Sequence, residues 1–180
     1  MDFTGSLINE FNSLPSFWWL WLIIVAVVAG VVNALVTGKK ITTKEIVFRS
    51  LLAAYVVFIL METIIGRKPG IARAEFIPFW SYRHPELRTE IILNYILFVP
   101  LGLLMYLCFG EKRNHRGVGI NTAKVALIGF LLSTSIEIIQ LVFKIGLFEF
   151  DDMIGNTIGC LIGAVVGKMI EKMMIKRGQT

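Results

Sequence analysis

Long apolar runs separated by short basic loops constrain this chain more than any other feature. The runs cover residues 16–36, 47–65, 91–109, 123–143 and 153–170. Each is close to the roughly 20 residues that a helix needs to cross a bilayer. With 56% of its residues hydrophobic and 17% charged, the chain is too apolar for an ordinary soluble domain. We expect one integral membrane domain over residues 1–180, an all-α polytopic helical bundle of about five transmembrane helices.

Three other regions complete this layout. Residues 1–15 are polar and lack Lys and Arg, residues 66–90 hold three prolines and several aromatics, and residues 171–180 form a basic tail. Because prolines break helices, we expect an irregular outer-side loop between helices 2 and 3. Basic loops favour the cytoplasmic side. With the N-terminus outside and the C-terminus cytoplasmic, the inner segments hold 12 Lys and Arg residues and the outer ones 6, so we predict this orientation in a plasma membrane.

Two of the runs carry polar residues at helical spacing. Ser133, Glu137 and Gln140 share one face of the fourth run. Asp152 and Asn156 share one face of the fifth run. Because a carboxylate facing lipid is costly, we expect the two faces to meet and to line a cavity. In the predicted orientation this cavity lies in the outer leaflet.

Two carboxylates in one cavity would alter each other's chemistry. Glu137 and Asp152 would each raise the other's proton affinity, which suits general acid–base catalysis or a hard cation held by oxygens. Structural interpretations stay open. Asp152 precedes a helix, where negative charge favours the helix dipole, and single amides between membrane helices more often stabilise packing. For Glu137, an intramembrane carboxylate, function is the default.

A ladder of small residues indicates close helix packing. It consists of Gly155, Gly159, Gly163 and Gly167 in the fifth run. Such a ladder is typical of two membrane helices in close contact. The second helix belongs either to the same chain or to another copy, so a homo-oligomer through this face is one expectation.

Metal and nucleic-acid chemistry find little support. Cys108 and Cys160 lie in different apolar runs, and His84 and His115 lie in different loops. We therefore expect no disulfide framework and no metal site built from cysteine or histidine, and we assign no metal ligand. The net charge of +5 sits in loops beside apolar runs, where it sets topology, so we expect membrane lipids rather than nucleic acid as partners. No cofactor is assigned.

Four motifs in order resemble the VanZ-like membrane proteins of bacteria. They are Arg67 followed by IPFWSY (77–82), NYILFVPLG (94–102), SxxIExxQ (133–140) and DDxxxNxxGxxxG (151–163). The resemblance implies a cell-envelope protein, since the founding member is associated with resistance to teicoplanin-type glycopeptides. One departure is that Glu149 takes an acidic position of the family, while the family's preceding arginine is replaced by Gly146 or Leu147.

Three functions remain open at this point. The first is an enzyme that modifies a lipid-linked or surface envelope component, with Glu137 and Asp152 as catalytic residues. The second is a protein that binds an envelope lipid, a lipid-linked cell-wall precursor or a lipoglycopeptide without catalysis, and the third, less favoured, is a cation- or proton-coupled transporter. The predicted substrate-binding residues are Arg67, Arg73, Phe79, Trp80, Asn94, Ser133, Gln140, Glu149 and Asn156.

Overall fold

The computed structural model describes residues 28, 32, 43–65, 70, 73–84, 88–110 and 119–176. The chain divides into two compact units, Met1–Ala54 and Tyr55–Thr180. The predicted polar segment 1–15 and most of the predicted first span, 16–36, lie outside the described residues. Within that span Val28 and Val32 are helical and exposed.

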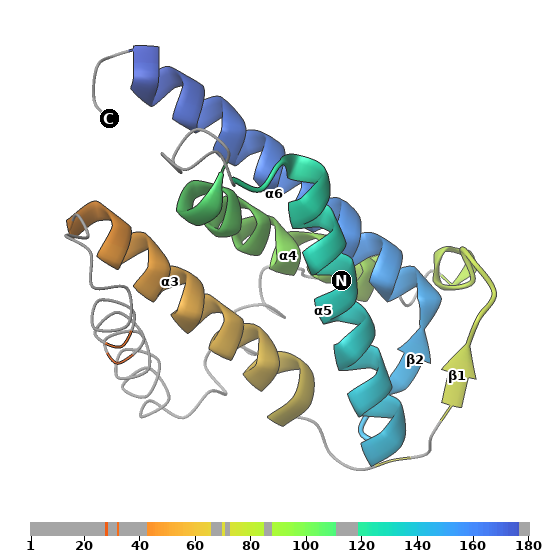
Figure 1. The fold of residues 1–180 in the computed structure, drawn as a ribbon. Coiled ribbons are helices and arrows are strands. Elements are labelled where there is room, and N and C mark those ends of the chain that lie inside the picture. The colour runs from red at the N-terminus through yellow and green to blue at the C-terminus, as the bar shows by residue number, and fades with distance from the viewer. Residues whose placement is uncertain are drawn as a thin grey trace. The chain divides into compact units, whose positions relative to one another are not determined.

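Four long helices follow in the described part of the chain. They are α3 (Thr43–Leu60), α4 (Arg88–Phe109), α5 (Thr122–Phe143) and α6 (Phe150–Lys176) (Figure 1). A π-helical turn, η1 (Met61–Ile65), continues α3. With that turn included, all four are long and apolar enough to cross a membrane. They confirm the membrane-bundle fold and the predicted spans 2 to 5.

The last helix is longer than its apolar run. It begins at Phe150, so Asp151 and Asp152 lie in its first turn rather than before it. It also continues to Lys176, so most of the basic tail predicted at 171–180 is helical. Acidic residues in the first turn and a lysine in the last both favour the helix dipole, which explains why the helix extends beyond its hydrophobic part.

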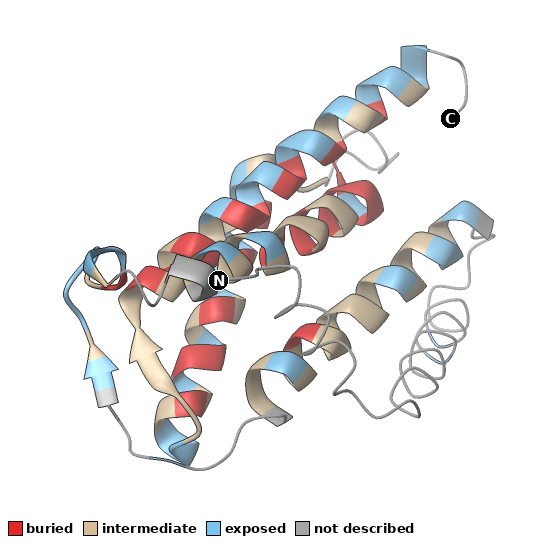
Figure 2. Ribbon diagram, turned by 180° about the vertical axis from the view of Figure 1, so that it is seen from behind, coloured by how far each residue is buried: buried red, intermediate tan, exposed pale blue. Residues whose placement is uncertain are grey.

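The glycine ladder is the surface on which α4 packs. A Cβ atom at Gly159 would lie 2.3 Å from the Tyr95 carbonyl oxygen, and one at Gly163 would lie 1.9 Å from that of Val99. Only glycine lets the two backbones come this close. The two helices run parallel, and buried residues concentrate where α4, α5 and α6 meet (Figure 2). The ladder's partner is thus in the same chain, and a homo-oligomer through this face would have to displace α4.

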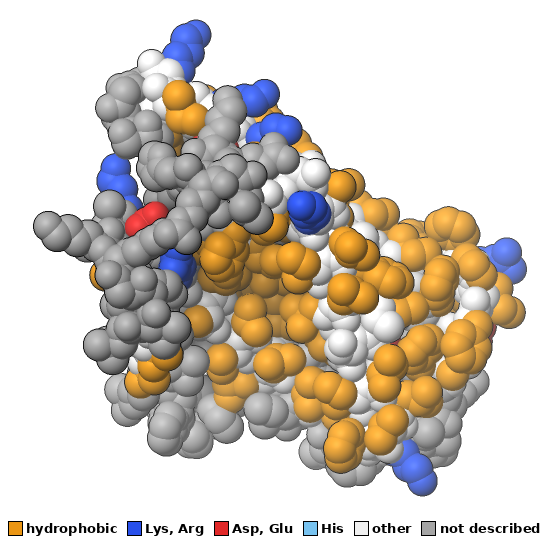
Figure 3. All heavy atoms as spheres, in the orientation of Figure 1, with side chains coloured by type: hydrophobic (Ala, Val, Ile, Leu, Met, Phe, Trp, Pro, Cys, Tyr) orange, Lys and Arg blue, Asp and Glu red, His pale blue; other side chains and the backbone are white. Residues whose placement is uncertain are grey.

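The outward side of α5 is strongly apolar. Its exposed large side chains include Leu127, Leu131, Ile138, Val142 and Phe143. In Figure 3 hydrophobic side chains spread over the described part of this face, and Lys and Arg side chains lie at its margins. An exposed surface of this composition suits contact with lipid.

Two short strands interrupt the helical pattern. Strand β1 (Arg73–Glu75) pairs in parallel with β2 (Leu147–Glu149), so that Glu75 lies opposite Glu149. The described part of the predicted irregular loop thus contains a strand and a short 3-10 helix, η2 (Ser81–Arg83). The α5 helix ends at Lys144, which has a left-handed backbone, and the Lys144 carbonyl accepts a hydrogen bond from Gly70 N–H (2.6 Å). The strand pairing was not predicted, because it joins segments far apart in sequence.

Candidate functional site

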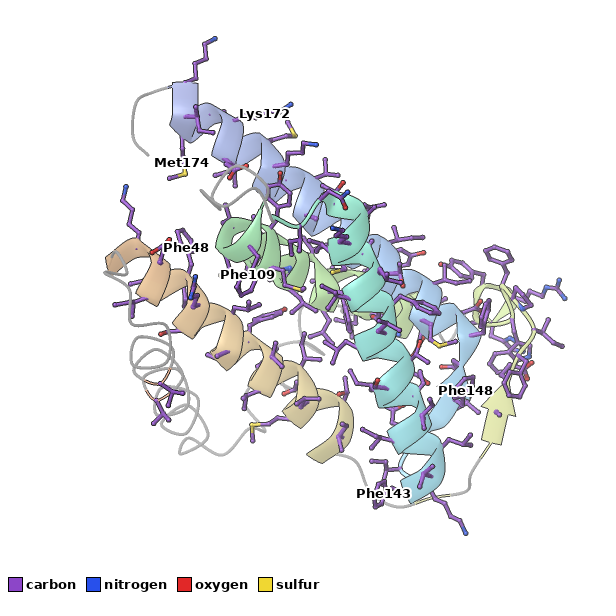
Figure 4. The ribbon with its side chains drawn as sticks, viewed as in Figure 1. Phe48, Phe109, Phe143, Phe148, Lys172 and Met174 are labelled. Atoms are coloured by element: carbon purple, nitrogen blue, oxygen red, sulfur yellow. The ribbon has the colours of Figure 1, made fainter. Side chains whose placement is uncertain are left out.

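Most buried polar side chains of the described residues lie toward the end of the bundle where α5 ends and α6 begins, which we call the loop end; Glu171, near the other end of α6, is the exception. We call the set the polar network, and it consists of Ser81, Ser133, Glu137, Gln140, Glu149, Asp151 and Asn156. All of these except the half-buried Glu149 are buried. Figure 4 labels Phe143 and Phe148 at this end of the molecule. The sequence predicted that the polar faces of α5 and α6 meet here, and the structure joins them by hydrogen bonds.

Glu137 holds the strand that links the two helices. Its side chain is 2% exposed, and its Oε2 atom accepts a hydrogen bond from Glu149 N–H (3.0 Å). This hydrogen bond ties α5 to β2. Glu137, predicted to be catalytic, therefore has a positioning task in the structure as well.

Asp151 holds the loop that follows β1. Its Oδ1 atom accepts from Phe79 N–H (2.6 Å) and its Oδ2 atom from Ser81 N–H (2.9 Å). The Ser81 hydroxyl donates in turn to Glu149 Oε1 (3.3 Å). The sequence marked Asp151 only as the first residue of the DDxxxNxxGxxxG motif. Its long-range role was missed because nothing local to Asp151 shows which distant N–H groups it will meet.

A hydrogen bond between two buried polar side chains connects the facing sides of α5 and α6. Asn156 Nδ2 donates to the Ser133 hydroxyl (2.8 Å), and Asn156 Oδ1 has no hydrogen-bond partner among the described residues. Glu137 lies one turn from Ser133, and Asp152 one turn from Asn156, both toward the loop end. At 1.5 Å per residue, each is about 6 Å along its helix from this bond. The two predicted catalytic carboxylates therefore lie at the same level, with Glu137 buried and Asp152 half-buried.

Gln140 reaches the end of the preceding span. Its Nε2 atom donates to the Thr63 carbonyl oxygen (2.8 Å) in η1. The last carbonyls of a helix lack partners within the helix, so the buried Gln140 amide satisfies one of them. Gln140, a predicted substrate-binding residue, thereby holds the end of η1. Arg67, also predicted to bind substrate, follows η1 in the sequence and lies outside the described residues.

Phe79 and Trp80, the two aromatic residues predicted to bind substrate, have different environments. Phe79 has a positive φ of 62° and is 58% exposed. Trp80 is half-buried, and its ring lies 4.2 Å from that of His84. The two side chains therefore differ both in exposure and in the rings that they contact. Arg73 is described only by its backbone, in β1.

A pair of tyrosines joins the loop to α4. The hydroxyl groups of Tyr82 and Tyr95 lie 2.7 Å apart. Burial raises the pKa of Tyr82, and the bond to Tyr95 and the charges of Asp151 and Asp152 raise it further. Asn94, beside Tyr95, is half-buried. Neither tyrosine was among the predicted site residues, although Tyr82 belongs to the IPFWSY motif.

Metal ligation finds no support in the described part of the chain. No group of three or more His, Cys, Asp or Glu side chains there is arranged to hold a metal ion. Carboxylate oxygens of Asp151, Glu137 and Glu149 instead accept hydrogen bonds from the protein.

Comparison with known proteins places the chain in a family. No curated protein and no solved structure matches it. The family model described as VanZ/LLP1 matches residues 45–171. This range covers α4, α5, the polar network and the glycine ladder, and most of α3 and α6. Because it takes in well over half of the chain, the protein belongs to the VanZ/LLP1 family.

Proposed function

We propose that this VanZ-like membrane protein acts in the bacterial cell envelope, where its loop end engages a lipid-linked or surface component. The loop end faces outward in this proposal, with the N-terminus outside and the C-terminus in the cytoplasm. The cellular consequence is reduced susceptibility to lipoglycopeptide antibiotics, whose targets lie on that side of the membrane.

The observation that carries the proposal is the position of the polar network. Polar side chains inside a membrane protein are costly unless they are paired or serve a function. Here, among the described residues, all the buried ones except Glu171 lie between the middle of the bundle and its loop end, where a headgroup can reach the edge of the network. The buried face of α6 farther on, from Gly159 to Gly167, is formed by Gly, Ala and Cys. A transport pathway across the described bundle is therefore less well supported than a site at one end.

Within this site the geometry favours binding over catalysis by Glu137. A general base must reach the proton that it removes, whereas Glu137 is buried and already accepts a bond from β2. Asp152 and Asn94 are half-buried. Asp152 lies close enough to the Tyr82–Tyr95 pair to affect Tyr82 electrostatically, and Asn94 precedes Tyr95 in α4. These side chains supply both donors and acceptors for a headgroup. Arg67 stays a predicted phosphate ligand, since its guanidinium matches phosphate oxygens.

Acid–base catalysis remains the second candidate because of one specific observation. Glu137 and Asp152 lie at the same level on facing helices, each one turn from the Ser133–Asn156 bond. A carboxylate pair in this setting can hold one shared proton. In this version Asp152 contacts the substrate and Glu137 tunes its proton affinity.

Binding of lipid-linked precursors to the purified protein in nanodiscs tests the proposal, with native mass spectrometry as the readout. Asp152→Asn should weaken binding roughly tenfold, as expected for the loss of a charge-assisted hydrogen bond. Arg67→Ala should weaken it as well. Glu171→Gln is the matched control, because Glu171 is also a buried carboxylate of α6 but lies at its other end. Equal binding by all four proteins would overturn the proposal.

Mass spectrometry of the lipids after incubation separates binding from catalysis. A new product that disappears in Glu137→Gln and in Asp152→Asn would establish the catalytic version. Binding without any product would exclude it.

The orientation of the protein in the membrane is tested separately by replacing two exposed lysines with cysteine. Lys144 lies just beyond α5 and Lys176 ends α6, and both side chains are exposed. In intact cells an impermeant thiol reagent should label Lys144→Cys and should label Lys176→Cys only after lysis. The reverse pattern would place the site on the cytoplasmic side.

A further inference from the structure

The loop after β1 presents an apolar edge whose exposed rings and aliphatic side chains the proposed function does not explain. We call this edge, Phe76, Ile77, Phe79 and Tyr82, the aromatic wedge. Its first three side chains are 65%, 55% and 58% exposed. Figure 1 shows this loop beside β2 and the start of α6. So much exposed apolar surface on one short loop calls for a partner.

The wedge is held in a fixed conformation from inside the protein. Phe79 has a left-handed backbone, which is unfavourable for a bulky residue. The buried Asp151 carboxylate offsets that cost by accepting from the N–H groups of Phe79 and Ser81. Ring contacts add support, at 5.8 Å between Phe79 and Tyr82. Strain that is maintained by surrounding bonds is commonly found at functional positions.

The wedge continues a surface that already suits lipid. Phe76 contacts Phe148 of β2, with ring centroids 5.2 Å apart. A few residues before β2, α5 ends with the exposed Val142 and Phe143. These apolar side chains therefore belong to one end of the lipid-facing bundle rather than to a separate patch on a soluble surface.

Charged side chains border this surface in the way that a membrane interface requires. Arg83 follows the wedge and Lys144 follows Phe143, and both are exposed. Lys and Arg near the ends of membrane spans place their charges among the phosphates. Aromatic rings prefer the adjacent boundary between headgroups and acyl chains.

We propose that the aromatic wedge inserts into the headgroup–acyl boundary of the bilayer and that Asp151 is the positioning residue that keeps it there. This inference goes beyond the proposed function, because it concerns contact with bulk lipid rather than with a specific ligand. Insertion sets the depth of the loop end, so that a lipid headgroup meets Asp152 and Asn94 without leaving the membrane.

The experiment measures the depth of single labels in proteoliposomes. Ile77→Cys and Phe79→Cys carry an environment-sensitive fluorophore, and the lipids carry a quencher near the headgroup or near the chain end. Leu131, halfway along α5 and exposed, is the hydrocarbon control, and the exposed Lys176 at the end of α6 is the water control. The unsubstituted chain gives the background, since Cys108 and Cys160 are buried.

Labels at 77 and 79 should shift to the blue and respond most to the quencher near the headgroup. The label at 131 should respond most to the deep quencher. If a water-soluble quencher reaches the labels at 77 and 79 as it reaches the label at 176, and neither lipid quencher does, the proposal is wrong. The aromatic wedge would then be a surface for binding another protein. Ligand binding by the same preparations is measured independently, so failure of one proposal does not imply failure of the other.

The role of Asp151 is tested in the same labelled proteins. Asp151→Ala should reduce the blue shift at residue 79 and spread its depth, because both backbone N–H groups lose their acceptor. Asp151→Glu should restore part of the shift, whereas Glu171→Gln should leave it unchanged. An unchanged label at 131 shows that each variant still folds in the membrane. If Asp151→Ala leaves the label at 79 in place, Asp151 has no positioning role.

Discussion

The α4–α6 seam and the loop end are held by opposite kinds of interaction. At the seam, backbones meet because Gly159 and Gly163 have no side chains. At the loop end, carboxylates reach backbone N–H groups of distant segments. The seam therefore should not tolerate one added carbon atom at these two glycines, whereas the loop end should tolerate a change of charge better than the loss of an acceptor. Close packing of backbones stabilises the seam, and hydrogen bonding stabilises the loop end.

The largest effect is expected at the seam. In Gly163→Ala the new Cβ would lie 1.9 Å from the Val99 carbonyl oxygen, so the helices must separate, at a cost of about 3 kcal/mol in unfolding free energy. Thermal unfolding in detergent measures it. Gly155→Ala is the matched control, because its nearest neighbour is the Tyr95 ring at 3.4 Å, and it should be close to neutral. Equal loss in both variants would show that close backbone approach is not what holds the seam.

A smaller effect is expected at Glu137. Glu137→Leu leaves the Glu149 N–H without its acceptor, which should cost about 2 kcal/mol. Glu137→Gln keeps an acceptor oxygen and should cost less than about 1 kcal/mol. Unfolding free energies measure the cost in both variants, and hydrogen exchange of the Glu149 amide measures the loss of its hydrogen bond. If both variants lose the same amount, the negative charge rather than the hydrogen bond is what matters here.

The bond between α5 and α6 should contribute less. Ser133→Ala removes the acceptor of Asn156 Nδ2 and leaves a buried amide unpaired, at about 1 kcal/mol. Replacing both residues, with Asn156→Leu added, removes the unpaired polar atoms as well and should return stability close to that of the unsubstituted protein. A double-mutant cycle measures the coupling. Simple additivity would contradict the direct bond.

The smallest effect concerns Tyr82 at alkaline pH. Its pKa is raised, first by burial and then by Tyr95 and the nearby aspartates. The folded protein thus holds this proton more tightly than the unfolded chain, so its contribution is complete below the ordinary tyrosine pKa of about 10 and is lost as pH rises through the folded value. Tyr82→Phe should lose less stability than the unsubstituted protein above about pH 10. Identical pH profiles would show that Tyr82 does not contribute.

Local composition was enough to predict the spans. The runs at 91–109 and 123–143 correspond to α4 (Arg88–Phe109) and α5 (Thr122–Phe143), because apolar length and flanking charge are properties of short segments. The shared face of Ser133, Glu137 and Gln140 also followed from helical spacing, and all three are buried. Orientation in the membrane and the roles of these residues stay predictions.

Helical spacing could not predict which residue or helix each of these side chains contacts. The glycine ladder predicted close contact without saying whether α4 or a second copy makes it. Phe79 and Trp80 are neighbours in sequence, yet one is exposed and the other stacks on His84, because the left-handed backbone at Phe79 turns the chain between them.

The sequence by itself determined a VanZ-like helical membrane protein, its spans from residue 43 onward and the polar faces of its last two helices. Only the tertiary structure decided that β1 pairs with β2, that Asp151 holds a loop 72 residues away, and that α4 fills the glycine ladder. The physical reason is range. Helix formation and membrane insertion depend on neighbouring residues, whereas a hydrogen bond between distant segments depends on where the whole bundle brings them.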